Sequence, residues 1–252
     1  MSPGRSVPTV GRPEPEAVRG MFTDLAPRYD LLNTVLSQGQ DRRWRRRAAQ
    51  LTRVKPGDRV LDVCTGTGAL AAILARQVGG RGEVIGVDLT EAMLKVARSR
   101  VAGVRFQAAD ACQLPFPDRT FAAATMAFGL RNIADRPRAL GELARVLRPG
   151  GRAVILEFSQ VHPALGAAYA WYSRRLIPPI ARLVLGRDSA YRYLTASIAA
   201  FATPEEVGGW MTQAGLVGVR VHRMSLGIVA LHVGRSPVSP QVGTDLAGPT
   251  GT

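Results

Sequence analysis

Short apolar runs alternate with segments of helical periodicity between residues 59 and 158, and this alternation constrains the fold more than any other feature. Runs typical of buried strands are found at residues 59–63, 83–87, 104–108, 121–128 and 152–158. Segments with apolar residues at helical spacing separate them, at residues 69–78, 90–100 and 138–147. Such βαβ units build a parallel sheet with helices on both faces. The sequence therefore predicts an α/β fold.

The pattern changes after the fifth predicted strand. Residues 162–200 are predicted to be largely helical, and another helix is predicted to begin after Thr203. Thr203, Pro204 and Glu206 have the spacing of a capping box with proline at the first helical position. The apolar segments that follow are predicted to pair as a closing hairpin, at residues 216–221 and 228–233.

The two ends of the chain differ in composition from its middle. Residues 1–15 and 235–252 are rich in Pro, Gly, Ser and Thr and lack apolar periodicity, which is typical of flexible tails. No internal repeat or long linker interrupts residues 16–234, so we expect a single domain there. Its helical segments outside the βαβ region, residues 16–52 and 162–200, are expected to form a cap.

A glycine-rich turn connects the first predicted strand to the following helix. Its sequence is Asp62-Val63-Cys64-Thr65-Gly66-Thr67-Gly68, and glycines at such a turn allow a ligand to approach the backbone and the helix N-terminus. Gly66, Gly68 and Ala71 also match the GxGxxA pattern of dinucleotide sites, with Asp88 at the distance expected of a ribose-binding acid. A site for NAD is therefore one interpretation of this loop.

Two further acids favour S-adenosylmethionine over a dinucleotide. Asp62 stands four residues before Gly66, where it would repel a pyrophosphate and attract an ammonium group. Asp110, followed by Ala111, ends the third predicted strand and offers an acceptor for an adenine amino group. The same loop with these acids resembles the class I methyltransferases.

Five further segments narrow the resemblance. In chain order they are Tyr29-Asp30-Leu31-Leu32-Asn33-x-x-Leu36-Ser37 with Trp44, Ala127-Phe128-Gly129-Leu130-Arg131-Asn132, Arg145-Val146-Leu147-Arg148-Pro149-Gly150-Gly151 through Glu157-Phe158-Ser159, Ser189-Ala190-Tyr191-x-Tyr193-Leu194, and Gly227-Ile228-Val229-Ala230-Leu231-His232. Together they resemble the ubiquinone/menaquinone biosynthesis C-methyltransferases over about residues 20–234. Five such segments in order are far more specific than any one alone.

The resemblance implies a Rossmann-like class I methyltransferase fold with a seven-stranded sheet and a helical substrate cap. It implies S-adenosylmethionine as the cofactor and C-methylation of a reduced prenylated quinone ring. Demethylmenaquinol is the expected substrate, and 2-methoxy-6-polyprenyl-1,4-benzoquinol of ubiquinone biosynthesis is the alternative. The implied cofactor-binding residues are Asp62, Gly66, Thr67, Gly68, Asp88, Leu89, Asp110 and Ala111, and the implied substrate-binding residues are Tyr29, Asp30, Asn33 and Tyr191.

Arg131 and Asn132 are the expected catalytic residues, because they follow the fourth strand at the edge where open α/β sheets bind ligands. A hydroquinone carbon becomes a good nucleophile once a neighbouring phenol loses its proton. Arginine retains its own proton, so we expect Arg131 to stabilise the phenolate, directly or through water, with Asn132 orienting the ring oxygen. Asp110 is a candidate for the final proton acceptor. His162 and His232 are not assigned catalytic roles, since an isolated histidine is more often structural.

The sequence departs from the family pattern at four positions. The family usually has His where Asp41 stands, and Asp where Ala69 and Ala122 stand. It usually has Glu where Ala196 stands.

Neither cysteine belongs to a motif with metal-ligand spacing, and no metal site is predicted.

The chain has 33 basic and 19 acidic residues and a formal charge of +14, which predicts an anionic partner. Five arginines surround Trp44 within residues 42–47, and residues 169–187 carry a second basic and aromatic stretch. Both stretches favour peripheral contact with an anionic membrane. An RNA-directed methyltransferase or RNA-binding protein is the alternative from another class, but no RRM or KH pattern is present and nucleic acid is disfavoured.

The expected location is the cytoplasm, at the inner face of a membrane. No secretory signal is recognised at the N-terminus, and no apolar run is long enough to span a bilayer. A homodimer is one option for the assembly that the sequence leaves open.

Overall fold

The computed structural model describes residues 15–159 and 189–238. The helices in these residues are α1 (Pro15–Leu25), α2 (Tyr29–Leu36), α3 (Gln40–Thr52), α4 (Ala71–Val78), α5 (Glu91–Arg100), α6 (Arg136–Arg145), α9 (Ser189–Ala199) and α10 (Pro204–Gln213). Short 3-10 turns are η1 (Ala26–Arg28), η2 (Leu130–Asn132) and η3 (Ser225–Gly227). The strands are β1 (Arg59–Val63), β2 (Glu83–Asp88), β3 (Arg105–Ala108), β4 (Phe121–Ala127), β5 (Leu147–Phe158), β6 (Val217–Met224) and β7 (Val229–Arg235).

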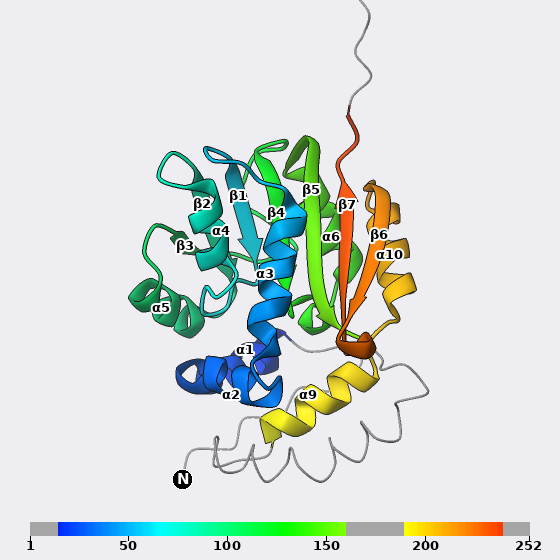
Figure 1. The fold of residues 1–252 in the computed structure, drawn as a ribbon. Coiled ribbons are helices and arrows are strands. Elements are labelled where there is room, and N and C mark those ends of the chain that lie inside the picture. Colours follow the sequence, from blue (N-terminus) through cyan, green and yellow to red (C-terminus); the bar gives the residue numbers. More distant parts are fainter. Residues whose placement is uncertain (1–14, 160–188, 239–252) are drawn as a thin grey trace, which may run out of the picture.

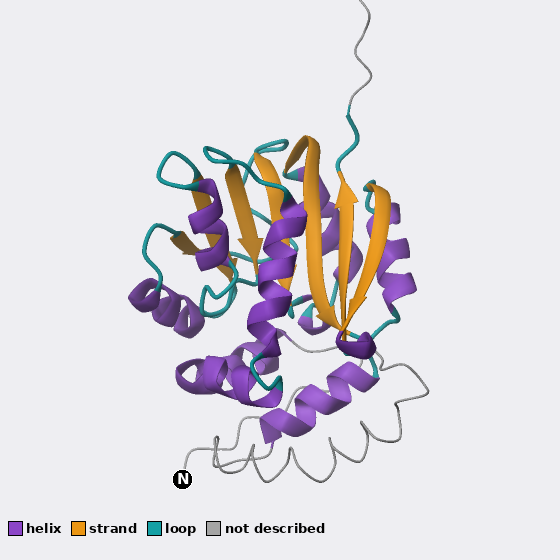
Figure 2. Ribbon diagram, viewed as in Figure 1, coloured by secondary structure: helices purple, strands orange, loops and turns teal. Residues whose placement is uncertain are grey.

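The strands form one seven-stranded sheet in the order β3-β2-β1-β4-β5-β7-β6 (Figure 1). Strands β1 to β5 run parallel, and β7 pairs antiparallel with both β5 and β6. Helices α3, α4 and α5 contribute to the core on one face of the sheet, and α6 and α10 to the core on the other (Figure 2). The predicted fold class, a mostly parallel sheet covered by helices on both faces, is confirmed.

Alternation of side chains along the central strands builds these two cores. Leu61 of β1 and Met126 of β4 belong to the core under α6 and α10, whereas Val60 and Ala123 belong to the core under α3 and α4. Residues 121–126 of β4 are all buried. Burial on both faces explains why this strand is a continuous apolar run.

The predicted C-terminal elements are present. The hydroxyl of Thr203 accepts from the backbone N–H of Glu206 at 3.3 Å, and the Glu206 carboxylate accepts from the backbone N–H of Thr203 at 2.7 Å. This capping box begins α10 with Pro204 at the first helical position, as predicted. Strands β6 and β7 form the predicted antiparallel pair.

Strand β5 begins earlier than expected. Leu147 already pairs with β4, and the register resumes at Arg152 after a bulge. The Gly150-Gly151 segment in this bulge exchanges two backbone hydrogen bonds with Ser236. Ordered structure therefore continues past residue 234, where the predicted C-terminal tail begins, and most of both predicted tails lies outside the described residues.

Helix α3 also differs from its expected place in the cap, because it packs against the sheet. Trp44, Ala48 and Ala49 lie on its inner face and join the core. Trp44 is 2% exposed, and its Nε1 donates to the hydroxyl of Ser225 at 2.8 Å. The interpretation of Trp44 as a membrane- or RNA-contacting ring is wrong, since the indole is enclosed by protein.

Helices α1, α2 and α9 lie at the end of the sheet toward which the parallel strands point (Figure 1). This is the position expected of a cap over the carboxyl edge of the sheet. Residues 162–188 of the predicted cap lie outside the described residues.

Candidate active site

A cavity of about 330 Å³ lies at the carboxyl ends of β1, β2 and β4, beside α1. Ligands of open α/β sheets bind at this edge. The cavity is lined by residues that the sequence predicts for all three roles: Tyr29, Gly66, Asp88, Leu89, Asp110, Ala111 and Asn132. Arg131 and Asp62 are not among the lining residues.

The glycine-rich turn after β1 brings the backbone to the cavity. Gly66 has φ of +56° and Gly68 has φ of +80°, a region that glycine adopts with little strain. A Cβ at Gly68 would also lie 2.8 Å from Cζ of Phe106. Both glycines are therefore needed for the shape of the turn, although only Gly66 lines the cavity.

Asp88 ends β2 and faces the glycine turn. Its Oδ2 accepts from the backbone N–H of Gly66 at 2.9 Å, and its Oδ1 accepts from the backbone N–H of Thr90 at 2.9 Å. Burial raises the pKa of Asp88, and these hydrogen bonds oppose that shift. Each carboxylate oxygen has a further lone pair, so Asp88 can still accept hydrogen bonds from a ligand in the cavity.

Asp62 lies behind the same turn and is 1% exposed. Its two oxygens accept from the hydroxyls of Thr125, at 2.6 Å, and Thr65, at 2.7 Å. Burial raises the pKa of Asp62 to about 6, while the two hydroxyls and the charge of Arg45 oppose the shift. The contact of Asp62 with an ammonium group stays a prediction.

The residues predicted from α2 divide into two groups. Tyr29 lines the cavity, whereas Asp30 fixes the helix: it accepts from the hydroxyl of Thr67 at 2.6 Å and from Arg100 at 2.8 Å. Asp30 and Thr67 thus join α2 to the glycine turn. Nδ2 of Asn33 is buried without a partner among the described residues. Tyr191 lies in α9, but its side chain is not among those that the structure describes.

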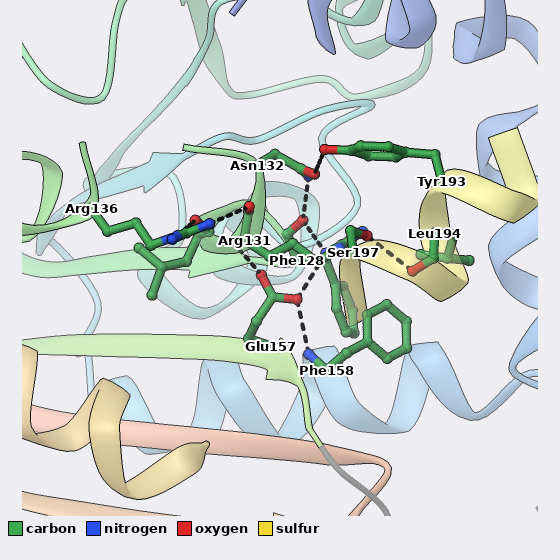
Figure 3. A network of polar contacts seen from close by, with 10 residues as sticks. Phe128, Arg131, Asn132, Arg136, Glu157, Phe158, Tyr193, Leu194 and Ser197 are labelled. Carbon is green, nitrogen blue, oxygen red and sulfur yellow. Dashed lines mark hydrogen bonds and ion pairs between the residues drawn. The ribbon is translucent and has the colours of Figure 1, made fainter. Parts of the chain in front are cut away.

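Arg131 forms a buried ion pair with Glu157 at the end of β5 (Figure 3). Its Nη1 donates to Oε1 of Glu157 at 2.8 Å and to the carbonyl oxygen of Phe128 at 2.6 Å. The side chains are 5% and 1% exposed. Glu157 also accepts from the backbone N–H groups of Arg131, at 3.2 Å, and Phe158, at 2.9 Å. The charge of Arg131 is therefore compensated within the protein, and its direct role at the phenolate stays a prediction.

Asn132 lines the cavity, and its side chain meets Tyr193 of the cap helix α9 (Figure 3). Its Nδ2 donates to the carbonyl oxygen of Phe128 at 3.4 Å, and its Oδ1 accepts from the hydroxyl of Tyr193 at 3.0 Å. The sequence alone assigns no role to Glu157 or Tyr193, although both stand in segments that carry the family resemblance. A glutamate inside an apolar strand run was the available signal for Glu157.

Asp110 is exposed at the cavity wall, and its Oδ1 accepts from the backbone N–H of Cys112 at 2.8 Å. This hydrogen bond holds the carboxylate where a substrate could reach it. His232, in contrast, is buried on β7 with Nε2 3.0 Å from the carbonyl oxygen of Pro204. Burial lowers the pKa of His232 to about 4, so the ring is neutral and structural.

Comparison with known proteins assigns the family. The model of the ubiE/COQ5 methyltransferase family matches residues 11–236. The chain belongs to this family. A relative from Thermus thermophilus, named demethylmenaquinone methyltransferase, is 48% identical over 222 residues, which are 86% of this chain and all of that protein. A relative from Teredinibacter turnerae, named ubiquinone/menaquinone biosynthesis C-methyltransferase UbiE, is 43% identical over 87% of this chain and 91% of its own length.

Solved structures show the same fold at lower identity. A SAM-dependent methyltransferase from Thermotoga maritima, described as a possible histamine N-methyltransferase, superposes with a TM-score of 0.62 at 20% identity, covering 87% of this chain and 99% of its own. A SAM-dependent methyltransferase from Aquifex aeolicus gives 0.54 at 21% identity, covering 86% and 98%. These structures show the Rossmann-like fold, and the match to the ubiE/COQ5 family shows that the chain is a methyltransferase with S-adenosylmethionine as its cofactor.

The cavity of this ubiE/COQ5 family member fits that cofactor. Carboxylates of Asp88 and Asp110 stand in its wall, where they can accept from hydroxyl and amino groups and favour a cationic ligand. The backbone at Gly66 and the side chain of Leu89 would complete the contacts. When bound, the cofactor supplies an electrophilic methyl group on a sulfonium.

The four departures from the family pattern lie in different environments. Asp41 is buried and accepts from Arg45 at 2.5 Å, and Arg45 in turn lies 5.3 Å from the ring centroid of Phe128. Asp41 therefore has a compensating partner four residues along α3. The other three positions do not line the cavity: Ala69 follows the glycine turn, Ala122 is buried in β4, and Ala196 is half-buried in α9.

Proposed function

We propose that this protein transfers a methyl group from S-adenosylmethionine to a ring carbon of reduced demethylmenaquinone. The observation that carries the proposal is that the residues lining the cavity suit the activity for which the relatives are named. The relative named demethylmenaquinone methyltransferase is 48% identical along its whole length. The residues that line the cavity include two of the three expected cofactor acids, Asp88 and Asp110, together with Asn132, which can donate to a ring oxygen.

The chain's own residues must bind the ring, exclude water and accept a proton. Asn132, Tyr29 and Asp110 all line the cavity, so its wall offers a ring a neutral donor, an aromatic face and a carboxylate. Holding the ring carbon against the methyl donor in a closed site supplies a large part of the rate. Asp110 is suited to accept the phenolic proton because its carboxylate is exposed at the cavity.

The benzoquinol of ubiquinone biosynthesis is the second candidate substrate. It is supported by the relatives named for both pathways, at 43% identity. The two substrates share the phenol whose ionisation activates the ring carbon, and they differ in the ring itself.

The test is a methylation assay on the purified protein with labelled S-adenosylmethionine. Chemically reduced demethylmenaquinone, reduced 2-methoxy-6-polyprenyl-1,4-benzoquinone and total RNA are offered in separate reactions, and the products are identified by mass spectrometry. We expect label in menaquinol and none in RNA. Label only in the benzoquinol would replace the substrate, and label only in RNA would overturn the quinone assignment.

We also propose that the protein binds peripherally to an anionic membrane, where a prenylated quinol resides. Among the described helices, none is long and apolar enough to cross a bilayer. Helix α3 instead exposes four arginines that have no ion-pair partner among the described residues: Arg42, Arg43, Arg46 and Arg47. Like charges at this spacing repel one another, which an anionic surface would relieve.

Further arginines on the α3 side of the sheet support binding to an anionic membrane. Arg152 pairs in register with Arg235 across β5 and β7. Burial lowers the pKa of Arg152, and the charges of Arg235, Arg53 and Arg220 lower it further, which indicates that these arginines lie near one another. We define the basic face as the exposed arginines of α3 together with Arg53, Arg152, Arg220 and Arg235.

A further inference from the structure

We propose that Tyr193 is a positioning residue for catalysis: its hydroxyl fixes the side-chain amide of Asn132 so that Asn132 donates an N–H to the ring oxygen of the quinol. This inference rests on the proposed function and adds a residue and a coupling to it. The hydroxyl of Tyr193 comes from the cap helix α9, whereas Asn132 belongs to η2 at the edge of the sheet.

The neighbours of Asn132 determine which way its amide points. The carbonyl oxygen of Phe128 can only accept, so it must face Nδ2 of Asn132, which lies 3.4 Å away. Oδ1 then faces the hydroxyl of Tyr193 at 3.0 Å. In a flipped amide, Oδ1 would face the carbonyl oxygen of Phe128, and two acceptors cannot form a hydrogen bond. Nδ2 would then keep a single partner, the Tyr193 hydroxyl, which can accept.

This arrangement leaves one donor of Asn132 unused by the described residues. An amide nitrogen carries two N–H groups, and the carbonyl of Phe128 takes only one. Asn132 lines the cavity, so the second N–H is available to a ligand there. A donor held in advance toward the oxygen that gains charge is the arrangement that lowers a transition-state energy.

The Arg131–Glu157 pair serves as the rigid base of this arrangement. Phe128 has φ of +60°, a strained value for a bulky residue. Its carbonyl oxygen accepts a hydrogen bond from Nη1 of Arg131 at 2.6 Å. Glu157 holds Arg131 from the other side. Nε of Arg131 has no partner among the described residues, but Arg131 does not line the cavity. Arg131 therefore fixes the acceptor of Asn132, and Asn132 is the residue that meets the ring.

The hydrogen bond also links the cap to the chemistry. Tyr193 is 4% exposed, and burial raises the pKa of its hydroxyl, while the charges of Arg131 and Arg136 oppose the shift. The hydroxyl is therefore protonated at neutral pH and acts as a donor. The orientation of the Asn132 amide therefore depends on a side chain of the cap helix as well as on the sheet edge.

The test compares Tyr193→Phe with the wild type on the quinol that the wild type methylates. The ring still packs, but the anchor of Asn132 is lost. We expect kcat to fall by roughly 3- to 10-fold, the effect of one hydrogen bond, with KM for S-adenosylmethionine unchanged. The control in the same helix is Ser197→Ala, because among the described residues the Ser197 hydroxyl bonds only to the carbonyl of Leu194, at 2.9 Å. This control should retain the wild-type kcat.

A double-mutant cycle with Asn132→Ala separates positioning from general destabilisation. Asn132→Ala alone should lower kcat by about 100-fold or more, as loss of an oxyanion donor does. In that background Tyr193→Phe should have no further effect, because there is no amide left to orient. Two effects that multiply would overturn the proposal, since Tyr193 would then act independently of Asn132.

A binding measurement provides a readout besides turnover. A prenylated naphthol is titrated by absorbance in complex with the protein and S-adenosylhomocysteine, and the ionised fraction is followed with pH. Tyr193→Phe should shift the ionisation of the bound naphthol to higher pH, and Ser197→Ala should not. Turnover and ionisation at wild-type levels in Tyr193→Phe would overturn this inference alone. A wild type that methylates no quinol would overturn the proposed function as well.

Discussion

Arg131 and Glu157 have the least exposed side chains of the ion pairs in the described residues, at 5% and 1%. Removing one partner of a buried pair leaves an uncompensated charge, which destabilises by about 3–5 kcal/mol. We therefore expect Arg131→Ala to lower the free energy of unfolding by that amount, measured by urea denaturation. Any loss of methylation in this variant would then include a loss of folded protein.

Glu157→Gln in the Arg131→Ala background supplies the control. It removes the buried negative charge while retaining the shape of the side chain, so it should restore part of the lost stability. If the two substitutions destabilise additively, the two charges do not compensate each other in the folded state.

Asp62 makes the stability depend on pH in a direction that is unusual for a carboxylate. Its pKa of about 6 in the folded protein lies above its ordinary value of 3.8, so the folded state binds the proton more tightly than the unfolded state. The stabilisation that Asp62 contributes is therefore complete below about pH 4, and it is lost as the pH rises through about 6. The loss is about 3 kcal/mol for a shift of this size.

Asp62→Asn should remove this pH dependence, as measured by the free energy of unfolding between pH 4 and pH 8 without ligand. The hydroxyls of Thr65 and Thr125 can each donate or accept, so an amide can replace the carboxylate there. Asp118→Asn, at an exposed carboxylate, should retain the wild-type profile. An unchanged slope in Asp62→Asn would show that another group titrates.

At the scale of single elements, α10 depends on its capping box. Thr203→Ala removes the acceptor for the backbone N–H of Glu206 and should destabilise the protein by about 1 kcal/mol. Thermal denaturation measures the change. Thr212→Ala in the same helix is the control. Within the part of the chain that the structure describes, the hydroxyl of this exposed residue bonds only to the carbonyl of Gly208, and alanine favours a helix. Equal losses in the two variants would assign the effect to the helix in general and not to its cap.

Elements whose signals are local could be predicted from the sequence. The capping residues of α10 and the buried runs of β1, β2 and β4 depend on neighbours in the chain, and the structure agrees with them. The periodicity of α3 predicts which of its faces is apolar, but not which surface that face covers. The sequence pattern therefore predicts a membrane contact for the Trp44 stretch, whereas the ring packs on the sheet.

At the scale of the molecule, the sequence predicts which residues reach the candidate site but not which side chains contact one another there. The sequence places Asp88 and Asn132 at strand ends, and topology alone then brings them to one cavity. The predicted catalytic residues have partners that lie far away in the chain. Glu157 contacts Arg131 across 26 residues, and Tyr193 contacts Asn132 across 61. No spacing rule predicts such contacts, so the compensation of Arg131 became visible only in the folded structure.

The basic face joins arginines of α3 with arginines of β5, β6 and β7, and we expect it to bind an anionic bilayer. Replacing Arg42, Arg43, Arg46 and Arg47 with Gln lowers the formal charge from +14 to +10, since four charges are removed. Each arginine near an anionic bilayer contributes about 1 kcal/mol, so the variant should bind anionic vesicles roughly 100- to 1,000-fold more weakly. Added salt should weaken the wild type in the same direction, since these exposed charges are screened.

The matched control removes four exposed arginines that already have carboxylate partners: Arg59, Arg98, Arg105 and Arg223. Its formal charge is also +10, but the charges it loses are largely compensated in the folded protein. We expect it to bind vesicles much more tightly than the α3 variant. Equal weakening of the two variants would assign binding to net charge alone. Failure of the wild type to bind vesicles, together with tight binding of RNA, would reassign the basic face to nucleic acid.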